Sequence, residues 1–231
     1  MTSPLPPLVA ALEGTLIVSC QAYPGEPMRD PRTMAQVAAA VAEGGASAVR
    51  AQGLEDIRQV REAVDVPVIG IWKDGEQGVF ITPTLDHALA VIDAGADVLA
   101  LDATDRPRPD GRSLAGTVEA IRTRTDIPLM ADCDSADSAR RAAELGIEII
   151  GTTLAGYTPA RAKTVGPDLA LLEELAGTLT GTSMLVAEGR VHTLEQAAAA
   201  KNAGAGAVVV GTAITHPTSI TRWFHDAVTG A

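Results

Sequence analysis

The segments AGADVLALDAT (94–104) and AGAGAVVVGTA (203–213) share one pattern, in which a glycine marks a helix end and a short turn leads into an apolar run. GGASAVRAQ (44–52) and LGIEIIGTT (145–153) repeat this pattern. A short apolar run bounded by turn residues is typical of a buried strand. The repeat therefore predicts four buried strands, each preceded by a helix.

A second series of apolar runs lies between these four: GTLIVSCQ (14–21), DVPVIGIWK (65–73), DIPLMADCD (126–134) and TSMLVAEGR (182–190). Between the runs, apolar residues spaced three and four apart indicate helices, several of which begin with Ser or Thr and end with Gly. The expected helices are 33–45, 54–64, 84–95, 113–125, 135–146, 169–177 and 193–204. Eight strands alternating with helices predict a (β/α)8 TIM barrel. A doubly wound open sheet is the alternative, but the repeated pattern favours a closed barrel.

The 231 residues suit one soluble domain, with the segment 1–14 helical and packed at the bottom of the barrel. This segment has no basic region before its apolar run, so we expect no signal peptide. No apolar run approaches the roughly 18 residues that cross a bilayer. Cys20 and Cys133 each lie at the end of an apolar run, which suits reduced thiols in a cytoplasmic protein.

The charge balance narrows the possible partners. A net charge of −11 disfavours binding to nucleic acid or to an anionic membrane, so an anionic ligand would need a local site. The cysteines and the four histidines show no metal-ligand spacing, and we expect no metal and no cofactor. The alanine-rich stretches 35–45 and 202–207 suit contact with a second copy as well as close helix–strand packing, and we expect a homodimer.

Loop lengths indicate which face of the barrel carries the site. The connections that follow strands are long, namely 21–32, 73–83, 102–112 and 152–168, whereas those that precede strands are tight. Long loops on one face are expected at the carboxyl ends of barrel strands, where active sites lie.

Polar residues end most of the predicted strands. A single polar strand end needs no explanation beyond contact with water, but a ring of them favours a binding site, and we place Thr153 among the substrate-binding residues. The strand-end residues are Gln21, Arg50, Gln52, Lys73, Asp102, Asp132, Thr152, Thr153, Glu188, Arg190, Gly211 and Thr212.

Lys73 and Glu188 end the third and seventh strands, which lie opposite each other in a ring of eight. Two acid–base groups on opposite sides of one carbon suit the inversion of a stereocentre. The lysine would need its pKa lowered, by burial beside Trp72 and by the positive charge of Arg50. A Schiff-base aldolase is the other lysine chemistry. It is disfavoured because the sixth strand carries no lysine and Lys163 lies farther along the following loop.

The ends of the last two strands suit a phosphate group. Gly189 and Arg190 follow the seventh strand, and Gly211 and Thr212 follow the eighth. In barrels of this kind, main-chain N–H groups of these two loops often bind phosphate.

Nine motifs, in the same order along the chain from Leu16, resemble the N-acetylmannosamine-6-phosphate 2-epimerases of bacterial sialic-acid catabolism. They are LIVSCQA (16–22), AVRAQGLEDI (48–57), VPVIGIWK (66–73), ITPTLDHA (81–88), LALDATDRPRPDG (99–111), LMADCDS (129–135), TTLAGYT (152–158), VAEGRVHT (186–193) and VVVGTAIT (208–215). The resemblance implies a phosphosugar barrel that interconverts N-acetylmannosamine 6-phosphate and N-acetylglucosamine 6-phosphate without a redox cofactor.

By the same resemblance, the family's catalytic lysine and glutamate fall on Lys73 and Glu188, and its substrate-holding residues on Gln21, Arg50 and Asp132. The reaction it implies is proton transfer at C2, next to the open-chain C1 aldehyde, with Lys73 taking or returning the proton and Glu188 serving either the other face or ring opening. One departure concerns the phosphate. The family typically reads AITRP after the eighth strand, whereas this chain reads AITHP, so His216 replaces an arginine as the expected phosphate ligand. The alternatives are an epimerase or isomerase for another phosphosugar, and a non-catalytic phosphosugar-binding barrel.

Overall fold

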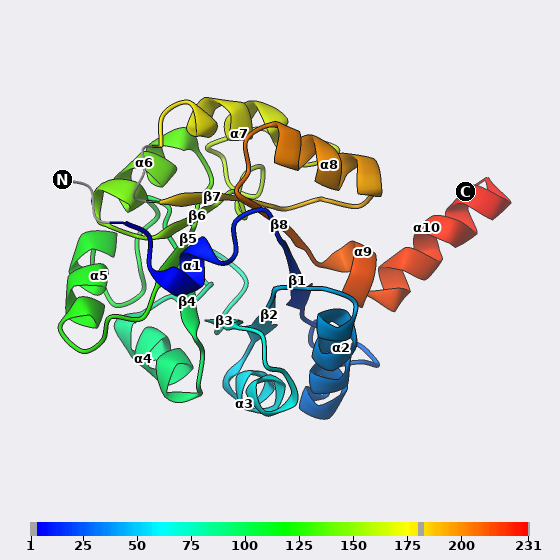
Figure 1. The fold of residues 1–231 in the computed structure, drawn as a ribbon, viewed down its shortest axis with the longest axis horizontal. Helices are drawn as coiled ribbons and strands as arrows, with labels where there is room; N and C mark the ends of the chain where they lie inside the picture. Colours follow the sequence, from blue (N-terminus) through cyan, green and yellow to red (C-terminus); the bar gives the residue numbers. More distant parts are fainter. Residues whose placement is uncertain (1–3, 180–182, 231) are drawn as a thin grey trace.

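The computed structural model describes residues 4–179 and 183–230, and over these residues the chain forms one closed barrel of eight parallel strands (Figure 1). The strands follow one another in sequence order around the barrel, and β8 pairs with β1. This confirms the predicted (β/α)8 TIM barrel and excludes the open sheet. The strands are β1 (Leu16–Cys20), β2 (Ala48–Gln52), β3 (Val68–Ile71), β4 (Val98–Asp102), β5 (Leu129–Asp132), β6 (Ile149–Gly151), β7 (Met184–Glu188) and β8 (Ala207–Val210).

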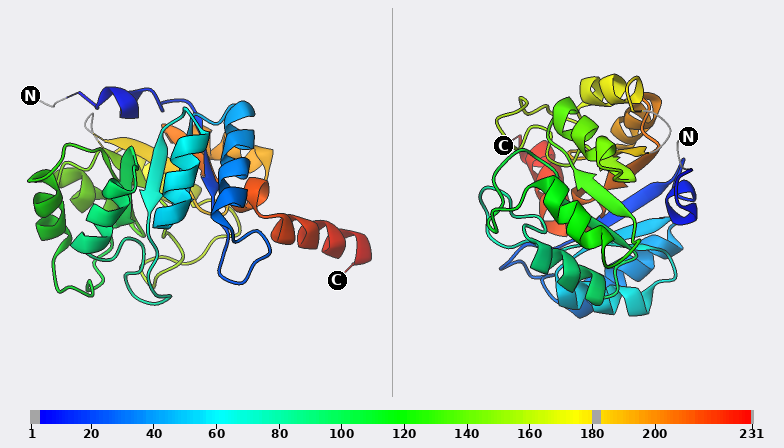
Figure 2. Two further views of the ribbon diagram at one scale, coloured as in Figure 1. Left: turned by 90° about the horizontal axis from the view of Figure 1, so that it is seen from below. Right: turned by 90° about the vertical axis from the view of Figure 1, so that its left-hand side faces the viewer.

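Helices on the outside of the barrel follow the first seven strands (Figure 2). Ser and Thr begin several of them as predicted: the side chains of Thr84, Ser113, Ser135 and Thr193 each accept a hydrogen bond from the first helical turn. These helices are α2 (Pro31–Glu43), α3 (Leu54–Ala63), α4 (Leu85–Asp93), α5 (Leu114–Arg122), α6 (Ala136–Glu144), α7 (Leu169–Ala176) and α8 (Leu194–Asn202).

Two apolar layers stabilise the barrel, one between strands and helices and one inside the ring of strands. Successive side chains of a strand alternate between these layers. On β3, Ile69 and Ile71 point inward, and the next inward position is Lys73. On β7, Val186 points inward and Glu188 follows it. The apolar interior therefore forms the floor beneath the polar residues that end these strands.

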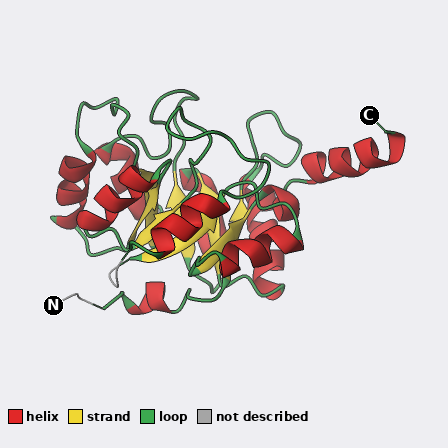
Figure 3. Cartoon of the chain, turned by 90° about the horizontal axis from the view of Figure 1, so that it is seen from above, coloured by secondary structure: helices red, strands yellow, loops and turns green. Residues whose placement is uncertain are grey.

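The N-terminal segment contacts the opposite end of the barrel from the long loops, which gather on one side in Figure 3. Within this segment the structure shows one helical turn, α1 (Pro7–Ala10), while residues 1–3 of the helix expected over 1–14 lie outside the described residues. Val9 and Leu12 are buried in the interior apolar layer. Gly14 N–H donates to the Gly206 carbonyl oxygen at 2.7 Å, which joins the segment to the start of β8.

The chain after β8 departs from the regular pattern. A short helix, α9 (Thr212–Thr215), is followed by α10 (Pro217–Thr229), which extends away from the barrel (Figures 1 and 2). None of the residues of α10, all of which the structure describes, is buried, and Phe224 is 70% exposed. The sequence analysis did not predict this helix, although Pro217 at its start and the apolar spacing of its later residues signal one. No helix within residues 4–179 and 183–230 has the length and apolar character to cross a membrane.

Close packing between β3 and its covering helices depends on Gly70. A Cβ atom there would lie 2.7 Å from both Ala96 Cβ and Val91 Cγ1. We expect Gly70→Ala to lower the free energy of unfolding by about 1–3 kcal/mol, because neither neighbour can move freely in a packed interior. Urea denaturation measures this change. Gly116→Ala is the control, because its Cβ would meet only Ser113 Oγ at 3.4 Å and alanine stabilises a helix interior by roughly 0.5–1 kcal/mol. Equal unfolding midpoints for the two variants would contradict this account of β3.

Candidate active site

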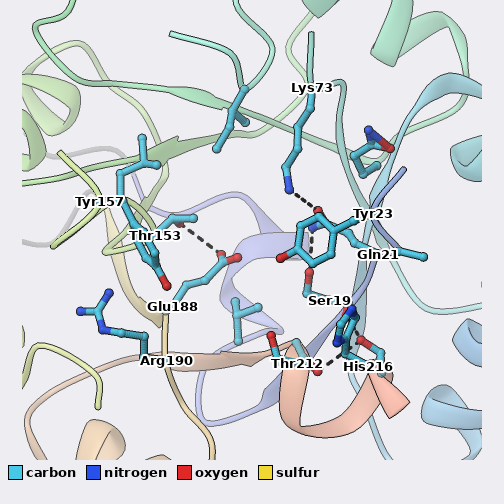
Figure 4. A pocket seen from close by; sticks show the side chains of 18 of the residues that line it. Ser19, Gln21, Tyr23, Lys73, Thr153, Tyr157, Glu188, Arg190, Thr212 and His216 are labelled. Carbon is cyan, nitrogen blue, oxygen red and sulfur yellow. Dashed lines mark hydrogen bonds between the residues drawn. The ribbon is translucent and has the colours of Figure 1, made fainter. Parts of the chain in front are cut away.

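A cavity of about 730 Å³ opens at the carboxyl ends of the strands, on the side of the long loops (Figure 4). Its lining comes from β1, β2, β7 and β8, from the loops that follow β1, β3, β6 and β7, and from the chain between β8 and the start of α10. All of the predicted site residues except Arg50 and Asp132 line it, namely Gln21, Lys73, Thr153, Glu188, Gly189, Arg190, Gly211, Thr212 and His216.

Lys73 enters the cavity from the end of β3, and its main chain is fixed by an antiparallel bridge to Ile81. Its ammonium nitrogen donates to Gln21 Oε1 at 2.7 Å, and Gln21 Nε2 donates in turn to Ser19 Oγ at 2.8 Å. The lysine is thus oriented by hydrogen bonds from β1, while Glu188 enters the cavity from another side (Figure 4).

Burial and the positive charge of Arg50 together lower the pKa of Lys73 to about 8, against the opposing charges of Glu188 and Asp132. The sequence analysis expected this direction and the contribution of Arg50. It also expected Trp72 to bury the lysine, which is wrong. Trp72 packs against the outer apolar layer, with its ring centroid 4.4 Å from that of His87. Neighbouring residues of an extended chain point to opposite faces, so Trp72 cannot share the cavity with Lys73.

Arg50 lies beneath the cavity, 1% exposed, with two acidic partners. Its guanidinium contacts both carboxylate oxygens of Asp132, Nη1 donating to Oδ1 at 3.0 Å, and it also contacts Glu188 Oε2. A buried charge is tolerated when it is paired in this way, and the guanidinium fork suits a bidentate carboxylate. The charge of the two carboxylates raises the pKa of Arg50 despite its burial, so the group is permanently positive.

Glu188 is held by Arg50 of β2 and by the two threonines that follow β6. In addition to Arg50, Thr153 Oγ1 donates to Asp132 Oδ1 at 2.6 Å and lies 3.2 Å from Glu188 Oε2. Thr152 fixes the main chain, its hydroxyl accepting from Glu188 N–H at 3.1 Å. Burial raises the pKa of Glu188, and the charge of Asp132 adds to this while Arg50 opposes it.

Asp132 is fully buried and, like Arg50, does not line the cavity. Both residues touch Glu188 or its partner Thr153 from below. Their expected contact with the substrate stays a prediction. The contacts present in the structure orient Glu188.

The ends of β7 and β8 meet at one wall of the cavity. Among the described residues, the main-chain N–H groups of Arg190 and Thr212 have no acceptor in the protein, and both residues line the cavity with Gly189. Gly189 and Arg190 both have positive φ angles, 110° and 57°, so the chain turns sharply where these groups point. The Gly211 backbone lies close to β1, since a Cβ there would be 3.2 Å from Ser19 Cβ.

The Arg190 side chain is engaged by the loop after β6. Nη1 donates to the Ala155 carbonyl at 2.8 Å, Nε to the Gly166 carbonyl at 3.1 Å and Nη2 to Thr164 Oγ1 at 2.9 Å. The guanidinium also lies 5.1 Å from the Tyr157 ring centroid. Arg190 therefore holds this loop against the cavity wall.

His216 lies at the start of α10 and is engaged through both ring nitrogens. Nε2 contacts Glu26 Oε1, and Nδ1 lies 2.8 Å from Ser219 Oγ. The tyrosines Tyr23 and Tyr157, which sequence reasoning missed, also line the cavity. Their exposed positions in long loops gave no periodic signal.

Two other candidates, Asp102 and Lys163, lie outside the site. Asp102, at the end of β4, orders its own loop by accepting hydrogen bonds from the Thr104 amide and hydroxyl and from Arg106. Lys163 is exposed and does not line the cavity, which fits its expected surface position. In the described part of the chain, no three His, Cys, Asp or Glu side chains are grouped in a way that could hold a metal ion.

Sequence comparison places this geometry in a known group. Residues 34–230 match the family model described as putative N-acetylmannosamine-6-phosphate epimerase. The chain belongs to this family. A relative from Cutibacterium acnes, named putative N-acetylmannosamine-6-phosphate 2-epimerase, is 59% identical over 221 residues, which are 96% of each chain. A relative of the same name from Corynebacterium glutamicum is 47% identical over 94% of each chain.

Solved structures support the same epimerase family. The N-acetylmannosamine-6-phosphate 2-epimerase from Clostridium perfringens superposes with a TM-score of 0.90 at 37% identity, covering 95% of this chain and 96% of that one. Thiamine phosphate pyrophosphorylase from Pyrococcus furiosus, with a TM-score of 0.60 at 18% identity, shares only the fold. The resemblance noted in the sequence is thereby confirmed, and the other phosphosugar and binding-only alternatives are not favoured.

The buried charges of this epimerase-family site give a stability test. Arg50→Met would leave the carboxylates of Asp132 and Glu188 buried without their cation, so we expect a loss of about 3–5 kcal/mol near pH 7. The loss should shrink as the pH falls. The pKa of Glu188 is already raised, and protonation removes one of the two unpaired charges.

Urea denaturation at several pH values measures this loss. Arg58→Met is the matched control, because its pair with Glu55 is 3.4 Å long and more than half exposed on both sides, so we expect a change below about 1 kcal/mol. Equal losses for the two variants would show that the buried cluster does not stabilise the fold.

Proposed function

We propose that this chain interconverts N-acetylmannosamine 6-phosphate and N-acetylglucosamine 6-phosphate by moving a proton between Lys73, C2 of the open-chain sugar, and Glu188. The two sugars differ only in configuration at C2. Removal of the C2 proton is feasible because the adjacent C1 aldehyde stabilises the resulting carbanion as an enolate. The planar enolate can then be protonated on its other face, which inverts the centre.

The paired pKa shifts carry this proposal. Burial lowers the pKa of Lys73 to about 8 and raises that of Glu188, so the proton affinities of the two groups approach each other. General acid–base catalysis is most effective when both pKa values lie near the working pH. In one direction the neutral amine of Lys73 takes the C2 proton and the protonated Glu188 supplies a proton to the other face. In the reverse direction the two groups exchange these roles.

The remaining residues bind and orient. Gln21 positions the lysine amine, and Arg50, Asp132 and Thr153 fix the Glu188 carboxyl group. We assign the phosphate to the wall where β7 and β8 end, with Gly189, Arg190, Gly211 and Thr212 supplying main-chain N–H groups and His216 at its edge. A phosphate there would offset the unsatisfied donors of that wall.

Proton NMR in heavy water tests the reaction. Starting from N-acetylmannosamine 6-phosphate, we expect the gluco epimer to accumulate with deuterium at C2. Lys73→Met and Glu188→Gln should each lower the rate by at least about 100-fold, as loss of a general acid or base does. Normal turnover in Lys73→Met would contradict the assignment, as would epimerisation without exchange.

The same pair sets the pH dependence. The productive enzyme carries one proton shared between Lys73 and Glu188, so kcat/KM should be bell-shaped in both directions. Activity should fall as the pH rises through about 8, where the pair loses this proton, and also when both groups are protonated in acid.

We also infer that the chain forms a homodimer through α10. In a (β/α)8 barrel the helix after β8 packs beside the helices that follow β7 and β1, here α8 and α2. Because α10 extends away instead, the α10 of a second copy can occupy that place, and the exchange is symmetric. Its apolar residues support this. Trp223, Phe224 and Val228 are exposed and Ile220 is half-buried, and the four are spaced three and four apart.

Light scattering coupled to size exclusion tests the dimer. We expect the protein to have twice the 23.7 kDa mass of one chain and Phe224→Asp to shift it to the single-chain mass, because a charge cannot be buried unpaired in such a contact. Arg222→Asp, on the opposite, polar side of the same helix, is the control and should keep the dimer. A single-chain mass for the unaltered protein would contradict the inference.

We further place the protein in the cytoplasm. Cys20 and Cys133 are both free thiols and both buried. Burial raises the pKa of Cys20 to about 12, so its thiol stays protonated and unreactive. Unpaired cysteines are usual in reducing compartments.

A further inference from the structure

The loop after β1 is fastened across the cavity mouth by residues with no role in the proton transfer. Glu26 contacts the His216 imidazole through Oε1 and accepts from the Tyr23 N–H through Oε2 at 2.8 Å. The Glu26 N–H donates to the Tyr23 carbonyl at 3.1 Å and closes a tight turn between them. The Tyr23 ring then stands edge-on to the His216 ring, with centroids 5.5 Å apart. We call Tyr23, Glu26 and His216 the clasp.

The clasp is anchored on both sides. His216 begins α10 and accepts a hydrogen bond from the Ser219 N–H at 3.3 Å, so its ring is fixed by the helix. At the far end of the same loop, Arg29 forms a pair with the buried Asp56 of α3 at 2.8 Å. The turn that carries Tyr23 is therefore held between α10 and α3.

Tyr23 lies beside the catalytic lysine. The Lys73 ammonium is 5.7 Å from the centre of its ring, and Tyr157 faces it across the cavity (Figure 4). An aromatic ring at this place excludes water from one side of the amine. Removing water from an ammonium group lowers its pKa, and burial is the largest of the causes that lower the pKa of Lys73.

We propose that Glu26 is a positioning residue, which acts through His216 to hold Tyr23 over the cavity and so keeps the Lys73 amine shielded from water. This inference rests on the proposed function, because Glu26 affects the reaction only through Lys73, the residue proposed to transfer the proton. The negative charge of Glu26 also holds His216, so the clasp joins the cavity mouth to the start of α10.

The other groups that set the protonation of Lys73 come from deeper in the barrel. Arg50 of β2 disfavours the ammonium form, while Asp132 of β5 and Glu188 of β7 favour it. Gln21, which follows β1, is a neutral acceptor, and Glu76 lines the cavity from the loop after β3. A Glu26 substitution changes none of these, so a change at the lysine would report the loss of shielding.

The test compares Glu26→Ala, Glu26→Gln and Tyr23→Ala with the control Glu43→Gln, an exposed carboxylate at the end of α2. We expect Glu26→Ala to lower kcat/KM by about 10- to 100-fold, as small misplacements of a catalytic site do. The alkaline limb of the kcat/KM–pH profile of Glu26→Ala should shift to higher pH than in the wild type, toward the ordinary lysine pKa of about 10.4. Glu26→Gln retains an acceptor for the Tyr23 N–H and should lie between wild type and alanine. The double variant Tyr23→Ala/Glu26→Ala should have the same kcat/KM as Tyr23→Ala alone, because Glu26 acts through the Tyr23 ring.

A second readout does not depend on turnover. The chain has three lysines, so acetylation of each can be followed by mass spectrometry against pH, with the exposed Lys201 as the internal reference. We expect the apparent pKa of Lys73 to rise in both Glu26→Ala and Tyr23→Ala and to stay unchanged in Glu43→Gln. An unshifted Lys73 pKa in folded Glu26→Ala, or additive losses in the double variant, would overturn the proposal. Absence of epimerisation in the wild type would instead overturn the proposed function.

Discussion

The burial of the Arg50 charge constrains the whole site. A guanidinium that is 1% exposed inside a barrel must be matched by acceptors, and Asp132 and Glu188 supply them from β5 and β7. These contacts cross the barrel interior and join strands that are not neighbours in the sheet. Glu188 therefore has one orientation available to it, and the apolar floor beneath the cluster keeps water from competing for the same hydrogen bonds.

The same cluster explains how a strongly acidic protein can run proton transfer near neutral pH. Formally, Lys73 and Arg50 balance Asp132 and Glu188, so the site has no net charge within a chain of −11. Arg50 makes the lysine a weaker base while it partly offsets the rise in the pKa of Glu188. Burial therefore brings the two pKa values toward each other, while the charge of Arg50 lowers both of them.

Periodicity carried most of the fold prediction, because the alternation of apolar strands and helices admits few closed arrangements. It also located Lys73 and Glu188, since parallel strands of a barrel end on one face and side chains alternate inward and outward. Periodicity could not show that Arg190 holds a loop or that Glu26 meets His216. Those facts depend on loop paths and on contacts between residues far apart in the chain. The direction of α10 was equally hidden, because an amphipathic pattern does not state what the apolar face packs against.

The pairing of β1 with β8 has a consequence for folding. This seam joins residues almost 200 positions apart, as in the hydrogen bond from Thr215 Oγ1 to the Ser19 carbonyl at 2.7 Å. Contacts of such long sequence separation form only after a large loss of chain entropy, so closure of the seam is slow compared with local helix formation. The wall assigned to phosphate borders this seam, and a nascent chain lacking β8 would have neither. A ligand that binds this wall binds the closed barrel and not the unfolded chain. A higher concentration of that ligand therefore raises the free energy of unfolding.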